Sequence, residues 1–299
     1  MIRVCSRGAS FLESRSTPPC PLYFAMPEPS SLESYVASFP SLLVAYSGGV
    51  DSALLAVVVR RVLGDRGGAA IGVSASLSVA QHQQALDVAR RFDLRLFEVP
   101  TGELADERYA GNTQARCYFC KRELWHRLRA LAEAERFGAL ADGTNADDLG
   151  DHRPGFRAGR EQGVYSPLAD VGYTKEQIRS EARSLDIPVW DAPAAPCLAS
   201  RIRYGVPVTR ERLEQVERAE AVLRSLGLTG NLRVRHRGSE ARVEVGAAQH
   251  DAVRCSRESI GSQLLALGFK RVTLDVAGYR RGSQLEQGSS SVEVLAELP

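Results

Sequence analysis

Residues 47–52 have the types and spacing expected of a phosphate-binding turn. They read Ser-Gly-Gly-Val-Asp-Ser, between the apolar run 42–46 and the helix-like run 53–63. A strand that turns through glycines into a helix directs backbone N–H groups at an anion, and the helix dipole favours negative charge there. Asp51 is a candidate ligand of Mg²⁺ beside a nucleotide pyrophosphate. The candidate phosphate contacts are Ser47, Gly48, Gly49 and Ser52.

The hexapeptide differs from a Walker-type loop. The pattern G-x-x-x-x-G-K-[ST] is absent from the sequence, so transfer of a γ-phosphate is not expected. The segment instead resembles the PP-loop of the ATP pyrophosphatase superfamily, which splits ATP between its α and β phosphates and adenylylates a substrate oxygen. The resemblance implies ATP and Mg²⁺ as cofactors. Ser74, at the end of the second predicted strand, is a candidate contact to adenosine. A chance Ser/Gly turn ahead of a helix is the alternative.

Three cysteines form a second candidate centre. Cys117 and Cys120 begin a long predicted helix, so they share one face and are expected to have lowered thiol pKa values. Cys197, in the proline-flanked run 195–201, could complete the site. Three thiolates are a poor closed zinc site, but they suit a [4Fe-4S] cluster with one open iron. Zinc with an additional histidine, or two buried thiols beside an idle one, stays open.

Two arginines suggest a second phosphate contact. Arg233 and Arg235 alternate on a predicted strand, so both guanidinium groups face one side and can bind a phosphate. Ser200 and Arg201 closely follow Cys197 and are candidates for holding the same substrate. Glu244, on the adjoining predicted strand, is interpreted as a surface carboxylate. A solvated strand face in an arginine-rich chain is the competing interpretation.

The composition limits the partners. The chain has 299 residues, 44% of them hydrophobic, and a net charge of only +2, which argues against a nucleic-acid partner. Only Lys121, Lys175 and Lys270 among the 38 basic residues are lysine. No apolar run is long enough to span a membrane, and residues 1–24 lack the apolar core of a secretory signal. We therefore expect a cytoplasmic protein.

The elements that must position these residues follow an alternating pattern. Apolar strand-like runs at 42–46, 70–74, 94–99 and 139–141 alternate with helical runs at 53–63, 79–92 and 117–137. This predicts an α/β fold with a doubly wound parallel sheet, in which ligands bind at the carboxyl ends of the strands. The polar run 142–148 is therefore placed beside the nucleotide.

The predicted domains follow from these elements. Residues 1–30 are expected to be a disordered tail, 31–196 a PP-loop ATP-binding domain of the adenine nucleotide α-hydrolase-like type, 197–281 a smaller α+β domain, and 282–299 a second disordered tail. The smaller domain has predicted helices at 210–225 and 247–267, which make Cys255 a core residue. Met26 is an alternative start, in which case Cys5 and Cys20 belong to an extension.

Five motifs together resemble the LarE family of ATP-dependent sulfur transferases. They are S-G-G-V-D-S, R-C-Y-F-C-K, D-G-T-N-A-D-D, A-P-C-L-A-S-R-I and L-R-V-R, spread over about two thirds of the chain. The resemblance implies adenylylation of a carboxylate of pyridinium-3,5-dicarboxylate mononucleotide and its conversion to a thiocarboxylate for the nickel-pincer nucleotide of lactate racemase. Cys197 matches the sulfur-donating cysteine of the family, and Arg233 and Arg235 match arginines that bind the substrate phosphate. A homo-oligomer and a nickel-insertion protein as partner are also implied.

The family has two forms. Members with a single cysteine sacrifice its sulfur, whereas members with an added C-x-x-C resemble thiolases whose three cysteines hold a [4Fe-4S] cluster carrying an extra sulfide. Cys117 and Cys120 indicate the second form. A PP-loop tRNA thiolase and an amide-forming adenylylating enzyme are the alternatives, and a non-catalytic ATP-binding regulator is disfavoured because it needs no clustered thiols.

Overall fold

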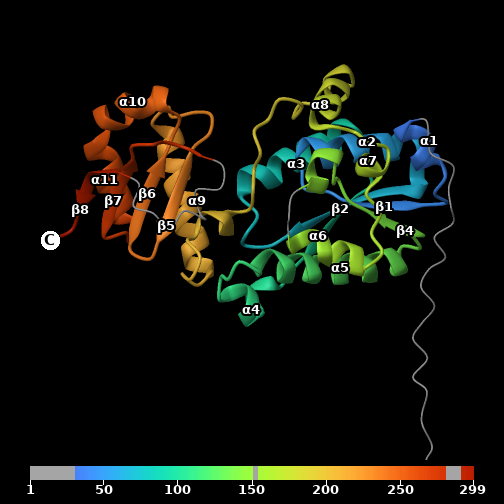
Figure 1. Ribbon diagram of the computed structural model, residues 1–299, viewed down its shortest axis with the longest axis horizontal. Helices are drawn as coiled ribbons and strands as arrows, with labels where there is room; N and C mark the ends of the chain where they lie inside the picture. The colour runs from blue at the N-terminus through green and yellow to red at the C-terminus, as the bar shows by residue number, and fades with distance from the viewer. Residues whose placement is uncertain (1–30, 151–153, 281–290) are drawn as a thin grey trace, which may run out of the picture.

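The computed structural model describes residues 31–150, 154–280 and 291–299, so the predicted tail at 1–30 lies outside the described residues (Figure 1). The first part of the chain forms α1 (Leu32–Ala37), β1 (Leu42–Ala45), α2 (Val50–Leu63), β2 (Gly67–Val73), α3 (Val79–Arg91), β3 (Leu96–Pro100), α4 (Glu107–Ala110), α5 (Arg116–Ala134), β4 (Ala139–Ala141), α6 (Pro154–Glu161), α7 (Pro167–Asp170) and α8 (Lys175–Ser184). The second part forms α9 (Arg210–Ser225), β5 (Arg233–Arg237), β6 (Glu240–Glu244), α10 (His250–Cys255), α11 (Arg257–Ala266), β7 (Arg271–Asp275) and β8 (Val292–Glu297).

The first sheet is parallel and covered on both faces, as the alternating pattern predicts. Its strand order is β3-β2-β1-β4, with β1 paired in parallel to both β2 and β4. One apolar core lies between the sheet and α1, α2, α3 and α8, and another lies against α5, on the opposite face (Figure 1). The fold is therefore α/β with a doubly wound parallel sheet.

The strand order creates a topological switch point beside β1. The chain runs from β1 to β2 and β3 on one side, and then returns to place β4 on the other side. Loops that leave β1 and β4 in opposite directions open a crevice at the carboxyl ends of these strands, which is where ligands bind in such sheets. Residues 47–52 follow β1 and residues 142–145 follow β4, so both line this crevice.

Three predictions for the second part of the chain are wrong. The order of its sheet is β5-β6-β7-β8, and β8 pairs antiparallel with β7 in a segment that we predicted to be a disordered tail. The buried Leu295 of β8 packs into the apolar core there, which explains the order of this segment. The single helix predicted at 247–267 is divided at Ser256 into α10 and α11. Cys255 is exposed at the end of α10 rather than buried in a core.

A small apolar cluster joins the two parts of the chain. Leu198, Ala199 and Ile202 pack with Tyr109 of α4 and with Leu213 and Val216 of α9. This cluster fixes the segment around Cys197 against the start of α5. No helix in the described part of the chain is long and apolar enough to cross a membrane.

Candidate active site

The PP-loop, residues 47–52, forms a tight turn between β1 and α2. Gly48 has φ of 76°, and a Cβ there would lie 2.7 Å from the Cβ of Ala85. The hydroxyl oxygens of Ser47 and Ser52 are 3.1 Å apart, and the Ser52 hydroxyl also accepts from the backbone N–H of Ser47. Gly49 caps α2, whose first N–H groups lack intrahelical partners. The turn therefore has the backbone of an anion-binding site.

Asp51 is the polar centre of this turn. Its two carboxylate oxygens accept hydrogen bonds from Lys175 Nζ at 2.7 and 2.5 Å, and Oδ1 also accepts from the side-chain amide of Asn145 at 3.3 Å. Gly143 allows this approach of the β4 loop, because a Cβ there would lie only 2.8 Å from the backbone nitrogen of Ser52. The PP-loop, the β4 loop and α8 thus meet at Asp51.

Lys175 is a functional candidate that sequence reasoning missed. A capping box begins α8: Thr174 and Gln177 satisfy each other's backbone N–H groups and place Lys175 at the first helical position. The backbone N–H of Lys175 donates to Asp147 at 2.7 Å, which orients the start of the helix. The rarity of lysine could have drawn attention to Lys175, because nearly every other basic residue of this chain is arginine.

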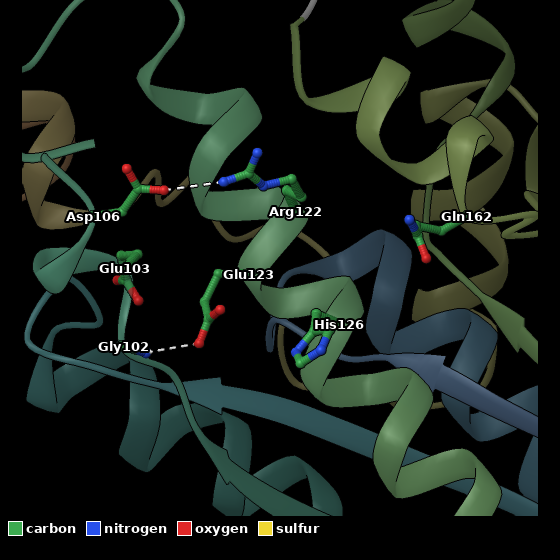
Figure 2. Close-up of a pocket in the computed structure, with 7 residues that line it drawn as sticks. All are labelled: Gly102, Glu103, Asp106, Arg122, Glu123, His126 and Gln162. Atoms are coloured by element: carbon green, nitrogen blue, oxygen red, sulfur yellow. Dashed lines mark hydrogen bonds and ion pairs between the residues drawn. The ribbon is translucent and has the colours of Figure 1, made fainter. Parts of the chain in front are cut away.

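Ser74 lies beyond the end of β2, as predicted, and has a buried partner. Its hydroxyl donates to Glu103 at 2.6 Å. Glu103 also lines a cavity of about 420 Å³ between the segment after β3 and α5 (Figure 2). Two carboxylates of that cavity are paired with arginines, because Arg122 pairs with Asp106 and Arg127 pairs with Glu123, which also accepts from the N–H of Gly102. Contact of Ser74 with adenosine stays a prediction.

The three cysteines gather where α5 begins. Cys117 and Cys120 lie in its first two turns, and Leu198, next to Cys197, donates its backbone N–H to the carbonyl oxygen of Ser76 after β2 at 2.8 Å. Cys197 is reachable by solvent, yet neighbouring protein is dense enough that burial raises the pKa of its thiol. Burial, followed by the nearby Cys197, raises the pKa of Cys120. The prediction that the helix N-terminus lowers the pKa of Cys120 is therefore wrong, because desolvation exceeds the effect of the dipole.

Arg201 shapes residues 194–201, which we call the cysteine loop. Its guanidinium donates to both carboxylate oxygens of the buried Glu220 of α9, at 3.0 and 3.2 Å. The same guanidinium donates to the carbonyl oxygens of Pro196 and Cys197. Glu220 gave no signal in the sequence, because it lies among other charged residues of an amphipathic helix.

Arg233 and Arg235 both reach the cysteine loop from β5. Arg233 donates to the carbonyl of Ala194 at 3.0 Å, and Arg235 donates to the carbonyl of Ser200 at 3.0 Å. Arg235 is also paired with Glu244 at 2.9 Å. Glu244 is 2% exposed, so its interpretation as a surface carboxylate is wrong; the neighbouring arginine makes its burial possible.

Two further residues hold the cysteine loop and the residues that follow it near the start of α5. The side-chain amide of the buried Asn112 donates to the carbonyl oxygens of Arg203 and Val206, at 2.8 and 2.6 Å. Arg116, the first residue of α5, donates to the carbonyl oxygen of Ala199 at 2.9 Å. Arg116 belongs to the motif R-C-Y-F-C-K, but only its cysteines attracted attention in the sequence.

The predicted site residues thus fall into two groups beyond the carboxyl edge of the first sheet. The PP-loop group lies at the β1 and β4 ends, and the cysteine group lies between α5, the cysteine loop and β5. Ser74 follows the strand between them, and the neighbouring Ser76 contacts the cysteine loop. Segments far apart in the sequence thus bring the PP-loop turn and a set of thiols to the same edge of the sheet.

Comparison with known proteins agrees with this arrangement. No family model matches the chain. An uncharacterized protein of Synechocystis sp. is 40% identical over 255 residues, which cover 84% of this chain and 94% of that protein. An uncharacterized protein of Methanocaldococcus jannaschii is 29% identical over 240 residues, 80% of this chain and 90% of that protein.

One relative has a named activity. The pyridinium-3,5-bisthiocarboxylic acid mononucleotide synthase of Lactiplantibacillus plantarum is 31% identical over 254 residues, which cover 85% of this chain and 92% of that protein. An identity at this level over nearly the whole of both chains, together with the PP-loop and the cysteine loop described above, shows that this chain belongs to the LarE family of sulfur transferases.

Proposed function

We propose that this protein is an ATP-dependent sulfur transferase that converts a carboxylate of pyridinium-3,5-dicarboxylate mononucleotide into a thiocarboxylate during nickel-pincer nucleotide synthesis. The carrying observation is that the segment around Cys197 packs against the start of α5, which contains Cys117 and Cys120, and contacts Ser76 just after β2. Because β2 is parallel to β1, this is the same sheet edge as the PP-loop. An activating site and a sulfur site on one edge suit a reaction that needs both in succession. The name of the Lactiplantibacillus relative supplies the substrate class.

The first step activates the substrate. A carboxylate oxygen attacks the α-phosphorus of ATP, and the bond to the β-phosphate breaks with release of pyrophosphate. The N–H groups of the PP-loop would hold the phosphates and Asp51 would hold Mg²⁺, while Lys175 would exchange its contact with Asp51 for one with a phosphate oxygen. Asn145 keeps the Asp51 carboxylate oriented during this exchange.

The second step forms the carbon–sulfur bond. A sulfur nucleophile at Cys197 attacks the acyl carbon, the bond to AMP breaks, and any proton on the sulfur passes to solvent. The bond that held this sulfur at Cys197 then breaks, its electron pair stays on the sulfur, and the thiocarboxylate leaves. No oxidant is required, because sulfur simply replaces oxygen on carbon. Arg233 and Arg235 hold the phosphate of the substrate, and Ser200 and Arg201 fix the shape of the cysteine loop.

The donor set fits a [4Fe-4S] cluster better than a single metal ion. Within the described residues, no group of three His, Cys, Asp or Glu side chains is close enough to hold one metal ion. Yet Cys197 lies near enough to Cys120 to help raise the pKa of its thiol, and Cys117 lies near enough to Cys197 to do the same there. Cluster ligands bind different irons, so their sulfur atoms stay apart. Cys117, Cys120 and Cys197 would hold such a cluster, which supplies a renewable sulfide at its open iron.

Product formation by Cys197→Ala tests the proposal. Wild type should convert the dicarboxylate to the thiocarboxylate, observed by mass spectrometry, while Cys197→Ala should bind ATP but form no thiocarboxylate. Cys255→Ala is the matched control, because Cys255 is exposed far from the other cysteines in the sequence and should be dispensable. Full thiolation by Cys197→Ala would rule out this role.

Iron analysis separates the two sources of sulfur. Anaerobically purified wild type should contain roughly four irons per chain with matching sulfide, and Cys117→Ala should lose them. An iron-free wild type that becomes lighter by one sulfur and two hydrogens on turnover would instead make Cys197 a sacrificial donor. That outcome would contradict the cluster while leaving sulfur transfer in place.

A further inference from the structure

Arg116 is a buried cation with an unusual set of partners. Its side chain is nearly inaccessible, with 3% of the residue exposed. Its Nη1 donates to the side-chain oxygen of Asn112 and the carbonyl oxygen of Ala199, and its guanidinium lies over the ring of Tyr204 at 5.0 Å. Its buried Nε has no hydrogen-bond partner in the part of the chain that the structure describes. None of these partners carries a negative charge.

The nearby Arg201 shows what a neutralised buried arginine looks like in this protein. It forms a two-pronged pair with Glu220, which compensates its charge. Placing an uncompensated charge in a protein interior is costly, so buried charges normally have a partner of opposite sign. Among the described residues, Arg116 has no such carboxylate. The missing negative charge must therefore come from the site that it faces.

That site is the group of cysteines. Arg116 directly precedes Cys117, and its hydrogen bond to Ala199 links it to the cysteine loop two residues after Cys197. The hydrogen bond to Ala199 therefore holds the guanidinium beside both Cys117 and the segment that carries Cys197.

We propose that Arg116 is the built-in positive charge that compensates the anionic sulfur held at Cys197. It is a positioning residue as well, because the same side chain connects α5 to the cysteine loop through Asn112 and Ala199. The identity of this anion as the sulfur to be transferred rests on the proposed function. The positive electrostatic potential at Cys197 does not depend on the proposed function, and it can be measured on metal-free protein without ATP or substrate.

Two alkylating reagents measure that potential. Iodoacetate is anionic and iodoacetamide is neutral, and both react with the same thiolate. The rate with iodoacetate divided by the rate with iodoacetamide therefore reports local charge independently of the thiolate fraction. Peptide mapping gives this ratio at Cys197 and, in the same molecules, at the exposed Cys255. In wild type at low salt, the ratio should be higher at Cys197 and should fall towards that of Cys255 as salt is added. Equal ratios at low salt would overturn the proposal without any variant.

Three variants then assign the potential to Arg116. Arg116→Gln keeps a donor but removes the charge, and should lower the Cys197 ratio about fivefold. Arg116→Lys keeps the charge and should stay within about twofold of wild type. Arg127→Gln removes a charge from the same helix at a residue paired with Glu123, and should change nothing. Circular dichroism confirms that each variant is folded.

The outcomes distinguish this inference from the proposed function. An unchanged ratio in Arg116→Gln, or equal losses in Arg116→Gln and Arg116→Lys, would mean that Arg116 acts only through its shape. Neither result would affect thiolation by wild type. Conversely, full thiolation by Cys197→Ala would remove the proposed sulfur chemistry and leave the labelling result intact.

Discussion

The two ends of the candidate active site carry their cations in opposite ways. At the PP-loop, Lys175 is neutralised by the Asp51 carboxylate, with both oxygens within hydrogen-bond distance. At the cysteine loop, Arg116 and Arg233 are buried and donate only to carbonyl and amide oxygens of the described residues. One end therefore holds a matched pair, whereas the other holds two buried cations without a carboxylate beside the matched pairs of Arg201 and Arg235.

This difference indicates how each end meets its ligand. A matched pair must exchange partners when Mg²⁺ and phosphates arrive, so its binding is coupled to a local rearrangement. An unmatched buried cation gains directly from an incoming anion, because the cost of burying it has already been incurred in folding. The first arrangement suits a ligand that enters and leaves as ATP does, and the second suits an anion that stays in place.

Removing the carboxylate of the matched pair should have the largest effect on activity. Asp51→Ala removes the proposed Mg²⁺ ligand, which is worth several kcal/mol of transition-state stabilisation, so pyrophosphate release should fall by about a thousandfold. Release is measured with ATP and the dicarboxylate substrate. The control is Asp65→Ala, which alters an exposed carboxylate just after α2. Unchanged adenylylation by Asp51→Ala would contradict the PP-loop assignment.

Breaking the matched pair behind the cysteine loop should chiefly affect stability. Glu220→Gln leaves Arg201 buried without its carboxylate, next to the already unmatched Arg233, and should lower the free energy of unfolding by about 3–5 kcal/mol. Urea denaturation measures this loss. Glu217→Gln, one turn earlier on α9, alters a partly exposed carboxylate that accepts from the N–H of Val79 and should cost much less. Equal losses in both variants would show that Arg201 needs no carboxylate.

The same contrast explains what the sequence could predict. The PP-loop and the Cys-x-x-C are each a short uninterrupted stretch of sequence, so their chemistry can be recognised locally. The periodicity of strands and helices predicted the parallel sheet. Lys175 lies 124 residues from Asp51, and no local pattern brings them together. Arg116 was visible in its motif, but its burial depends on Asn112 and on a loop more than eighty residues away. Long-range pairing of charge is thus the part that sequence patterns could not provide.

A smaller effect is expected at the cation of the PP-loop pair. Lys175→Met removes one charge-assisted contact to phosphate, worth about 1.5–3 kcal/mol, so the KM for ATP should rise by about 10- to 100-fold. Asp51 keeps its contact with Asn145, so Mg²⁺ binding should persist. Lys121→Met, on α5, is a matched control with the same loss of charge. A normal KM for ATP in Lys175→Met would mean that Lys175 only neutralises Asp51.

The smallest predicted effect concerns the buried His236 of β5. Its Nε2 lies 3.0 Å from the side-chain oxygen of Gln215, and burial, assisted by the nearby Arg212, lowers the pKa of His236 to about 4. The unfolded chain binds a proton near pH 6.5, whereas the folded protein resists it until about pH 4. Stability from this group is therefore complete above pH 6.5 and is lost as the pH falls towards 4. Urea unfolding at pH 7 and pH 5 should show this loss in wild type, and His236→Gln should reduce it, because glutamine cannot be protonated in this range. Equal losses in both proteins would place the acid sensitivity elsewhere and would show that a buried base next to an arginine can be accommodated here without consequence for folding.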